Sequence, residues 1–135
     1  MKVRDLEGNL SNFKLNGSII NAADNRARSK LHVQAREILY KLFPTMPILE
    51  EVLIHTRPRR NQYLDFYINK LKLAIEVHGQ QHYKFNSLFH ASGQDFLKQK
   101  KMDQDKKDWC ELNNITYIEL PFNEVDKWKK MITQR

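Results

Sequence analysis

Two acidic residues stand in two short segments whose alternating apolar and polar residues could place them together for chemistry. Residues 64–68 read Leu-Asp-Phe-Tyr-Ile, and residues 73–79 read Leu-Ala-Ile-Glu-Val-His-Gly. Such alternation is typical of β-strands, and the four residues between the segments fit a hairpin loop. Counting back along the antiparallel strands then places Asp65 directly opposite Glu76, where two carboxylates repel each other. A divalent cation between them removes this repulsion, so the pattern predicts a metal site.

The same alternation assigns the side chains of the hairpin to two faces. The core face is expected to hold Leu64, Phe66, Ile68, Leu73, Ile75 and Val77. The other face is expected to hold Asp65, Glu76 and His78. Mg²⁺ is a hard cation that prefers oxygen ligands, and a metal beside a histidine is a combination suited to phosphodiester hydrolysis. The alternative is that the two carboxylates are simply solvated on the outer face of a hairpin.

A family resemblance rests on these residues. Asp65, ten residues, then Glu76-Val77-His78 resembles the Asp…(Asp/Glu)-x-Lys signature of the PD-(D/E)XK nuclease superfamily, with His78 in the lysine position. Residues 74–82, Ala-Ile-Glu-Val-His-Gly-Gln-Gln-His, resemble the His-Gly…His segment of the very-short-patch repair endonucleases and of the phage homing endonucleases with an E-D-x-H-D pattern. Residues 103–110 and 115–121 are similar to the closing helix and strand of this group.

The resemblance implies an α/β fold with an αβββαβ restriction-endonuclease-like core, in which helices flank a central mixed sheet. It also implies that the chain hydrolyses phosphodiester bonds in DNA with Mg²⁺, for which Mn²⁺ is expected to substitute. The metal ligands would be Asp65, Glu76 and the carbonyl oxygen of Val77. The catalytic set would be Asp65, Glu76, His78, His82 and Lys106.

Three further residues are expected to support this site. They are His32 or Glu37 from the first helix, and Asp103, which shares a helix face with Lys106. An ordinary solvated charge pair is the alternative for Asp103 and Lys106. The role of His82 stays open between phosphate contact, proton donation and packing, because it stands one residue earlier than in the repair enzymes.

A second group of candidates is basic. Arg57, Arg59 and Arg60 precede the strand of Asp65 and are expected to clamp phosphates of DNA. The surface is expected to continue through Lys84, Lys98, Lys100 and Lys101. The chain has 23 Lys and Arg residues against 16 Asp and Glu residues, a formal net charge of +7. This excess favours an anionic partner such as nucleic acid, although a solvated face is the alternative for each side chain alone.

The elements that position these residues are expected in the order helix, three strands, helix, strand. The first helix begins after Ser29, a good N-cap residue, and ends before Pro44. The expected strands are residues 51–55, 64–68, 73–79 and 115–120, and the later helices are residues 94–113 and 124–132. Residues 56–61 are expected to form a basic turn. Residues 1–27 are expected to be an arm or hairpin, and residues 28–135 a single nuclease domain.

The composition limits the number of domains and the compartment that are expected. A chain of 135 residues is long enough for one core. Its single cysteine excludes an internal disulfide and favours a reducing cytoplasm, the host cytoplasm if the chain is phage-encoded. Neither a signal peptide, nor a membrane partner, nor a small-molecule cofactor is expected.

The sequence therefore predicts a Mg²⁺-dependent endodeoxyribonuclease of the repair or homing type, encoded by a phage. Two alternatives stay open at this point. One is a catalytically silent nucleic-acid-binding domain of the same fold, and the other is a ribonuclease or structure-specific junction nuclease. The sequence also leaves open whether the chain is a monomer or a homodimer, and whether it binds one metal ion or two.

Overall fold

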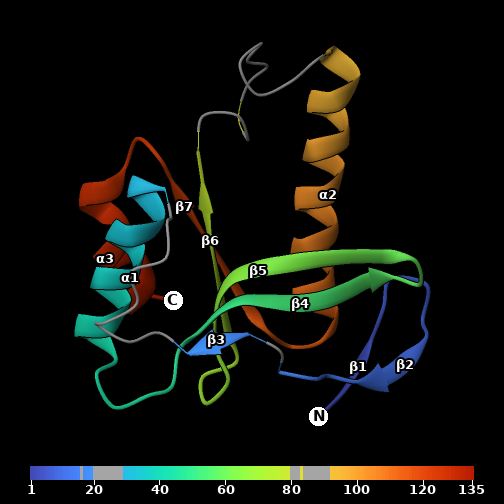
Figure 1. Ribbon diagram of the computed structural model, residues 1–135, viewed down its shortest axis with the longest axis horizontal. Coiled ribbons are helices and arrows are strands. Elements are labelled where there is room, and N and C mark those ends of the chain that lie inside the picture. The colour runs from blue at the N-terminus through green and yellow to red at the C-terminus, as the bar shows by residue number, and fades with distance from the viewer. Residues whose placement is uncertain (16, 20–28, 80–82, 84–91) are drawn as a thin grey trace.

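The structure, a computed structural model, describes residues 1–15, 17–19, 29–79, 83 and 92–135 (Figure 1). Its elements, in chain order, are β1 (Lys2–Arg4), β2 (Leu10–Asn12), β3 (Ser18–Ile19), α1 (Lys30–Leu42), β4 (Leu49–Arg57), β5 (Arg60–Ile68), β6 (Leu73–His78), α2 (Gly93–Leu112), β7 (Thr116–Pro121) and α3 (Trp128–Thr133). A single 3₁₀ turn, Val125–Lys127, precedes α3. The predicted α/β class is confirmed.

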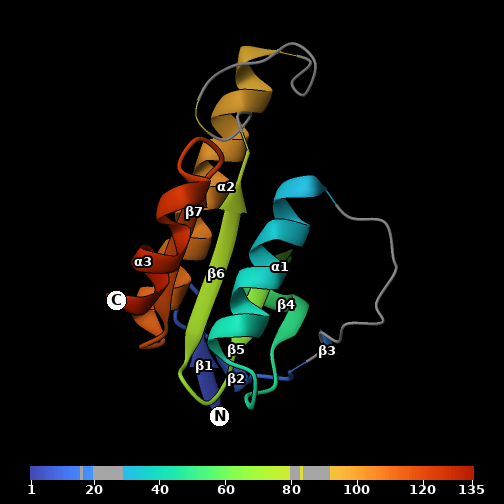
Figure 2. The same cartoon turned by 90° about the vertical axis from the view of Figure 1, so that its left-hand side faces the viewer.

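The main sheet has five strands in the order β3-β4-β5-β6-β7. Its first four strands pair antiparallel, whereas β6 and β7 pair parallel, so the sheet is mixed. A parallel pair needs a crossover connection, and α2 lies in that connection. Helices α1 and α2 lie on opposite sides of β6 (Figure 2), and the N-terminal half of α2 extends beyond the sheet.

Helix α1 begins where the sequence predicts. Ser29 has an extended backbone, and its side chain accepts a hydrogen bond from the backbone N–H of His32 at 3.1 Å. This contact satisfies one of the unpaired N–H groups at the start of the helix. The helix ends at Leu42, two residues before Pro44, because proline cannot continue the backbone ladder.

Both faces of the sheet are buried, so the described residues form two apolar clusters. Helices α1 and α3 cover the first cluster, which contains Ala35, Leu39, Ile48, Phe66, Ile68, Leu73, Ile75, Ile118, Leu120, Trp128 and Ile132. Helix α2 covers the second, which contains Val3, Val52, Ile54, Leu64, Tyr67, Ala74, Trp109, Cys110 and Ile115. The face that carries the two carboxylates is therefore a covered face and not an outer surface.

The β5–β6 hairpin has the predicted register. Ile68 pairs with Leu73 and Phe66 pairs with Ile75, so the next step along the strands brings Asp65 opposite Glu76. The loop between the strands is residues 69–72, as counted from the sequence.

One residue of the predicted core face is misplaced. Leu64 packs in the cluster under α2, whereas Phe66 packs under α1 and α3, so the expectation that they share a face is wrong. The reason lies in the neighbouring strand, where Glu51 stands opposite Asp65 in the register and has a left-handed φ of 54°. The strand changes faces at this point, because Glu50 contacts α1 while Val52 packs under α2.

The turn between β4 and β5 is also tighter than predicted. Arg57 and Arg60 form the last cross-strand pair, so only Pro58 and Arg59 make the turn, whereas the sequence predicts a basic turn over residues 56–61. A side-chain hydrogen bond from Thr56 to Gln62, at 2.6 Å, joins the two strands just behind this pair. The two arginines are therefore held in strands.

The described part of the N-terminal segment docks onto the main body. Strands β1 and β2 form a small antiparallel hairpin, and β3 joins the edge of the main sheet beside β4. Phe13 packs its ring against Tyr67 and Trp109, with ring centroids 5.4 and 5.5 Å apart. Gly17 approaches β4 so closely that a Cβ atom there would lie 2.8 Å from the Glu50 carbonyl oxygen. None of the helices in the described ranges has the length and apolar character needed to cross a membrane.

Candidate active site

The structure brings the two predicted carboxylates together at the α2 face of the sheet. Asp65 Oδ2 accepts a hydrogen bond from the backbone N–H of Val77 at 2.8 Å, which ties the aspartate to the strand that carries Glu76. Glu76 is only 2% exposed. Burial raises the pKa of Glu76 well above its usual value, and the negative charge of Asp65 raises it further. Two carboxylates in this arrangement favour a positive charge beside them.

Lys106 supplies a positive charge from α2. Its Nζ lies 3.0 Å from Oε1 of Glu76 and forms a salt bridge with it. Burial by itself lowers the pKa of Lys106, but the charges of Glu76 and Asp65 outweigh this effect and raise it above its usual value. The three side chains form what we call the acidic cluster, in which two carboxylates share one ammonium group.

His78 lies beside the acidic cluster but contacts a different carboxylate. Its imidazole is buried, with Nδ1 3.0 Å from Oε1 of Glu119 on β7 and Nε2 3.4 Å from the hydroxyl of Tyr117. The Tyr83 hydroxyl donates to Oε2 of Glu119 at 2.7 Å. The hydrogen bond from His78 lowers the pKa of Glu119 to about 2, so this carboxylate stays charged at neutral pH.

These contacts surround a small pocket of about 140 Å³ next to the acidic cluster. Its lining residues are His78, Tyr83, Lys100, Asp103, Gln104, Lys107, Tyr117 and Glu119. The sequence predicted Asp103 and His78 in this region but assigned no chemistry to Tyr117 or Glu119. The available signal was the alternation in residues 116–121, which puts these two side chains on one face of a strand.

The two candidates from α1 lie elsewhere. His32 contacts Glu50 and stacks on the Phe66 ring with centroids 4.5 Å apart, on the face that α1 covers. Arg36 donates two further hydrogen bonds to Glu50, at 2.9 and 3.0 Å. Burial alone would raise the pKa of Glu50, but hydrogen bonds from Arg36 and His32 outweigh it and lower the pKa. Glu37 is exposed, so the structure shows no contact of either candidate with the acidic cluster.

Two of the predicted DNA-binding arginines meet a carboxylate on α2. Arg57 donates to both carboxylate oxygens of Asp105, from Nε at 3.0 Å and from Nη2 at 3.2 Å. Arg60 donates to Oδ2 of Asp105 at 3.1 Å. We call these three side chains the basic cluster. The other basic candidates that the structure describes, Arg59, Lys98, Lys100 and Lys101, are exposed. His82 and Lys84 lie outside the described residues.

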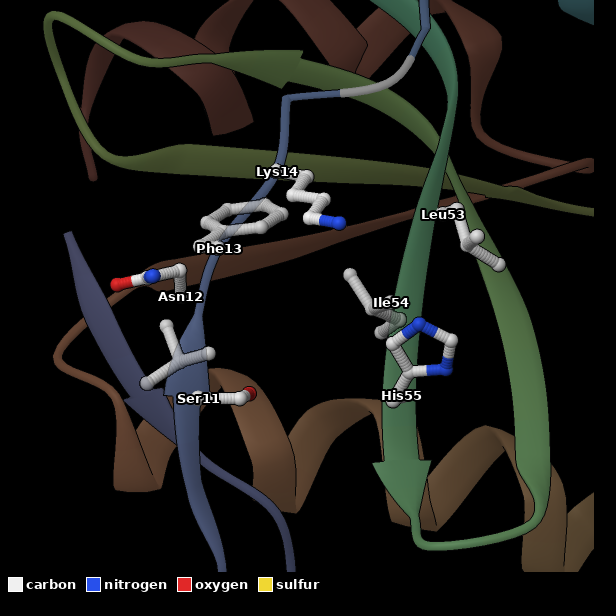
Figure 3. Close-up of a pocket in the computed structure, with 8 residues that line it drawn as sticks. Ser11, Asn12, Phe13, Lys14, Leu53, Ile54 and His55 are labelled. Atoms are coloured by element: carbon white, nitrogen blue, oxygen red, sulfur yellow. The ribbon is translucent and has the colours of Figure 1, made fainter.

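A larger pocket, of about 290 Å³, lies away from the predicted residues. It opens between the segment Ser11–Lys14 and residues Leu53–His55 of β4 (Figure 3). The side chains that line it include Phe13, Lys14 and His55. Because it contains none of the predicted catalytic or metal-binding residues, its size alone does not make it a candidate active site.

Asp65 and Glu76 of the acidic cluster offer oxygen donors of the kind that Mg²⁺ prefers. Within the described ranges, no group of three or more His, Cys, Asp and Glu side chains is arranged to hold a metal ion. The suitable donors are instead Asp65, Glu76 and the Val77 carbonyl, which lies on the same side of the strand as the Val77 N–H that Asp65 accepts. Burial raises the pKa of Glu76 and the nearby charge of Asp65 raises it further, so a cation beside the two carboxylates would stabilise their charged forms. Mg²⁺ keeps several water ligands, so two carboxylates suffice.

Comparisons with known proteins find viral relatives. The chain is similar to uncharacterized protein 307L of Invertebrate iridescent virus 6, at 42% identity over 66 residues, which is 49% of this chain and 34% of that protein. It is also similar to uncharacterized protein 094L of Frog virus 3 (isolate Goorha), at 44% identity over 64 residues, 47% of this chain and 41% of that protein. Uncharacterized protein 033L of Invertebrate iridescent virus 3 is 32% identical over 62 residues, 46% of this chain and 32% of that protein.

The match to these relatives is partial, since the chain spans only about a third to two fifths of their length. No family model matches the chain, and no solved structure matches it. The descriptions of the three relatives name no activity, so the function is argued from the site.

Proposed function

We propose that the chain is a metal-dependent endonuclease of the PD-(D/E)XK type, which hydrolyses phosphodiester bonds in DNA at the acidic cluster. The proposal rests on the resemblance of the Asp65, Glu76 and His78 motif to the superfamily signature. It also rests on the order of the elements, α1, β4, β5, β6, α2 and β7. The viral origin of the relatives fits a nuclease that a phage or another virus encodes.

One observation carries the proposal, the salt bridge between Lys106 and Glu76 beside Asp65. The superfamily signature has a lysine two residues after its second acid, where this chain has His78. Here α2, the helix between β6 and β7, supplies a lysine to the second acid of the motif. The three functional groups of the signature, two carboxylates and one ammonium, are therefore available although the sequence motif lacks the lysine.

The acidic cluster suits the chemistry of phosphodiester hydrolysis. Mg²⁺, when bound, supplies a polarised water molecule and neutralises charge on the phosphate. Asp65 and Glu76 would hold the ion, and the Val77 N–H keeps Asp65 in position. The Lys106 ammonium is able to donate to a phosphate oxygen as negative charge develops there, and its low exposure strengthens this interaction.

In this proposal His78 is an acid or base beside the acidic cluster, and Glu119 holds its imidazole in position. Because Glu119 binds Nδ1, the imidazole presents Nε2 to the pocket, where Tyr117 is its contact at 3.4 Å. In its protonated form the imidazole can donate from Nε2 to an oxygen of the substrate. Lys100 and Lys107 line the same pocket and add positive charge.

A second candidate function is a catalytically silent nucleic-acid-binding domain with this arrangement of elements. The same salt bridge is the observation that favours it, because Lys106 already balances part of the charge on the two carboxylates without a metal ion. Both candidates predict binding to nucleic acid, and only the nuclease predicts metal-dependent cleavage at Asp65 and Glu76.

A single assay separates the candidates. Supercoiled plasmid, a four-way DNA junction and single-stranded RNA are each incubated with the protein in Mg²⁺, Mn²⁺ or EDTA. We expect cleavage of DNA with either metal and none in EDTA, with Asp126→Asn, an exposed acid near α3, as a variant of unchanged rate. Binding without cleavage in all three conditions would favour the silent domain. Cleavage only of the junction or of RNA would keep a nuclease and change its substrate.

A further inference from the structure

The basic cluster combines a buried carboxylate with two partly exposed guanidinium groups. Asp105 is almost completely buried, with 5% of its side chain exposed, while Arg57 and Arg60 remain 35% and 32% exposed. Arg57 forms a two-pronged contact with both Asp105 oxygens, and Arg60 adds a third hydrogen bond. The carboxylate therefore sits underneath, and the two guanidinium groups lie between it and solvent.

The charges of this cluster do not cancel. The hydrogen bond from Arg57 lowers the pKa of Asp105, so the carboxylate is ionised at neutral pH and contributes one negative charge. Two guanidinium groups leave one positive charge in excess within the cluster; around it, Lys101 adds a positive charge, while Glu7 and Asp108 act on Arg57 as negative charges. Each guanidinium has five N–H donors, whereas Asp105 uses two from Arg57 and one from Arg60. Donors therefore remain for an anion.

The backbone around the two arginines is fixed. Arg57 and Arg60 pair across the hairpin, on either side of the two-residue turn. Behind them the Gln62 amide donates to the Met102 carbonyl of α2 at 3.0 Å, while its own oxygen accepts from Thr56. The hairpin end is thus tied to α2 one turn from Asp105. Groups that are ordered before binding lose less entropy when a ligand arrives.

We propose that Asp105 is a positioning residue that organises Arg57 and Arg60 into a preformed clamp for a backbone phosphate of nucleic acid. The identity of this partner rests on the proposed function. A paired guanidinium fork is well matched to a phosphate, which it contacts through two parallel hydrogen bonds.

The clamp lies at a defined distance from the acidic cluster. Arg60 stands five residues before Asp65 in β5, which corresponds to about 17 Å along the strand. A duplex rises about 3.4 Å per nucleotide step of one strand. The clamp would therefore hold a phosphate a few nucleotide steps from the bond that is cleaved, and not the scissile phosphate itself.

The sign of one mutational effect tests the proposal. Asp105→Asn removes a negative charge and raises the formal net charge from +7 to +8. If only net charge matters, this variant binds DNA more tightly, as any loss of an acid should. If Asp105 positions the arginines, the variant binds several-fold more weakly in spite of its added charge. Glu111→Gln is the matched control, because Glu111 is exposed on the same helix and its loss changes the charge equally.

The measurement is the affinity for a fluorescently labelled 30-base-pair duplex in EDTA, over a series of salt concentrations. EDTA removes divalent metal ions, so binding is measured without cleavage. If Asp105→Asn weakens binding and Glu111→Gln does not, but the protein cleaves no DNA with Mg²⁺, the proposed nuclease is overturned and the clamp is not. Tighter binding of Asp105→Asn, equal to that of Glu111→Gln, overturns the clamp. A wild-type protein that does not bind the duplex overturns it too.

A second pair of variants decides the question if Asp105→Asn unfolds at the assay temperature. Arg57→Lys and Arg60→Lys keep the charge and lose the fork. We expect each to weaken binding several-fold while the slope of log affinity against log salt changes little, because the number of charges is the same. Wild-type affinity in both lysine variants would show that the arginines act as simple point charges and would overturn the proposal.

Discussion

Two consecutive residues of α2, Asp105 and Lys106, sit in clusters of opposite composition. Lys106 is a single cation against Asp65 and Glu76, whereas Asp105 is a single anion between two arginines. Neighbouring residues of a helix point about 100° apart, so one turn of α2 serves β6 on one side and the β4–β5 hairpin on the other. One cluster has more carboxylates than cationic groups, and the other has more cationic groups than carboxylates.

This difference matches the two needs of a nuclease. A site with excess carboxylate favours a metal ion, and a site with excess guanidinium favours a phosphate. The acidic cluster is also the more deeply buried, since Glu76 and Lys106 are less exposed than the two arginines. Chemistry that requires a low dielectric is therefore expected at the first cluster, and contact with a large partner at the second.

The largest effect is expected when an acid of the acidic cluster is removed, and it tests whether the two clusters differ in role. Asp65→Asn and Glu76→Gln are each expected to lower metal-dependent cleavage at least about a hundredfold, because the metal ion loses a ligand. DNA affinity in EDTA should change little, since the basic cluster is intact. Plasmid cleavage measures the first effect and duplex binding the second. Cleavage at the wild-type rate in either variant would mean that the acidic cluster is not the active site.

Removing the lysine is expected to have an effect no larger than this. Lys106→Met should lower the cleavage rate about a hundredfold while the protein still binds metal, because the loss is that of a charged donor to the phosphate. Lys129→Met, an exposed lysine on α3, is the control of equal charge change. If Lys106→Met cleaves as fast as the control, His78 and not Lys106 fills the place of the superfamily lysine.

His78 and Glu119 line the pocket beside the acidic cluster, and their variants test how far the cleavage rate depends on this pocket. His78→Ala is expected to lower single-turnover cleavage at saturating Mg²⁺ about tenfold to a hundredfold, with DNA affinity retained. His78→Lys should restore part of the rate. Glu119→Gln should cost less, about tenfold, because the amide oxygen can still accept from Nδ1. An alanine variant with wild-type kinetics would reduce His78 to a buried residue that packs at the strand end.

The smallest expected effect concerns stability at the basic cluster. Asp105→Asn should lower the free energy of unfolding by about 1–3 kcal/mol at pH 7, less than for a fully buried ion pair, since the arginines stay partly hydrated. The pKa of Asp105 is lowered in the folded chain, so its contribution is present above the usual aspartate value near 3.8 and is lost as pH falls through the folded value. Denaturant unfolding of both proteins between pH 7 and pH 3 measures this. A stability difference that grows on acidification would contradict the ion pair.

Local patterns in the sequence were sufficient for the carboxylate pair. A four-residue loop determines the register of a hairpin, so the position of Asp65 opposite Glu76 followed from counting. The caps and breakers of α1 were equally local, as Ser29 and Pro44 show. The placement of Leu64 was not, because both faces of the sheet are buried and the apolar alternation continues through the point where Glu51 changes the face.

Local sequence patterns did not predict the contacts between distant segments. Glu119 meets His78 only because β7 pairs parallel with β6, and the alternation in a strand gives its faces but not its partner. Asp105 reads as one acid in a charged helix, and its pairing with Arg57 depends on where α2 crosses the hairpin. For His32 the local pattern was misleading. Matching the apolar positions of the first helix to the family placed His32 near the metal, whereas in the fold it contacts Glu50.

The central claim, that Asp65 and Glu76 form a metal site, is tested most directly by anomalous diffraction from crystals that contain Mn²⁺. The account predicts one anomalous peak between the two carboxylates, within ligand distance of both and of the Val77 carbonyl, and no peak at this position in Asp65→Asn crystals. A peak elsewhere, or the Lys106 ammonium still bound to Glu76 with no peak at saturating Mn²⁺, would contradict it.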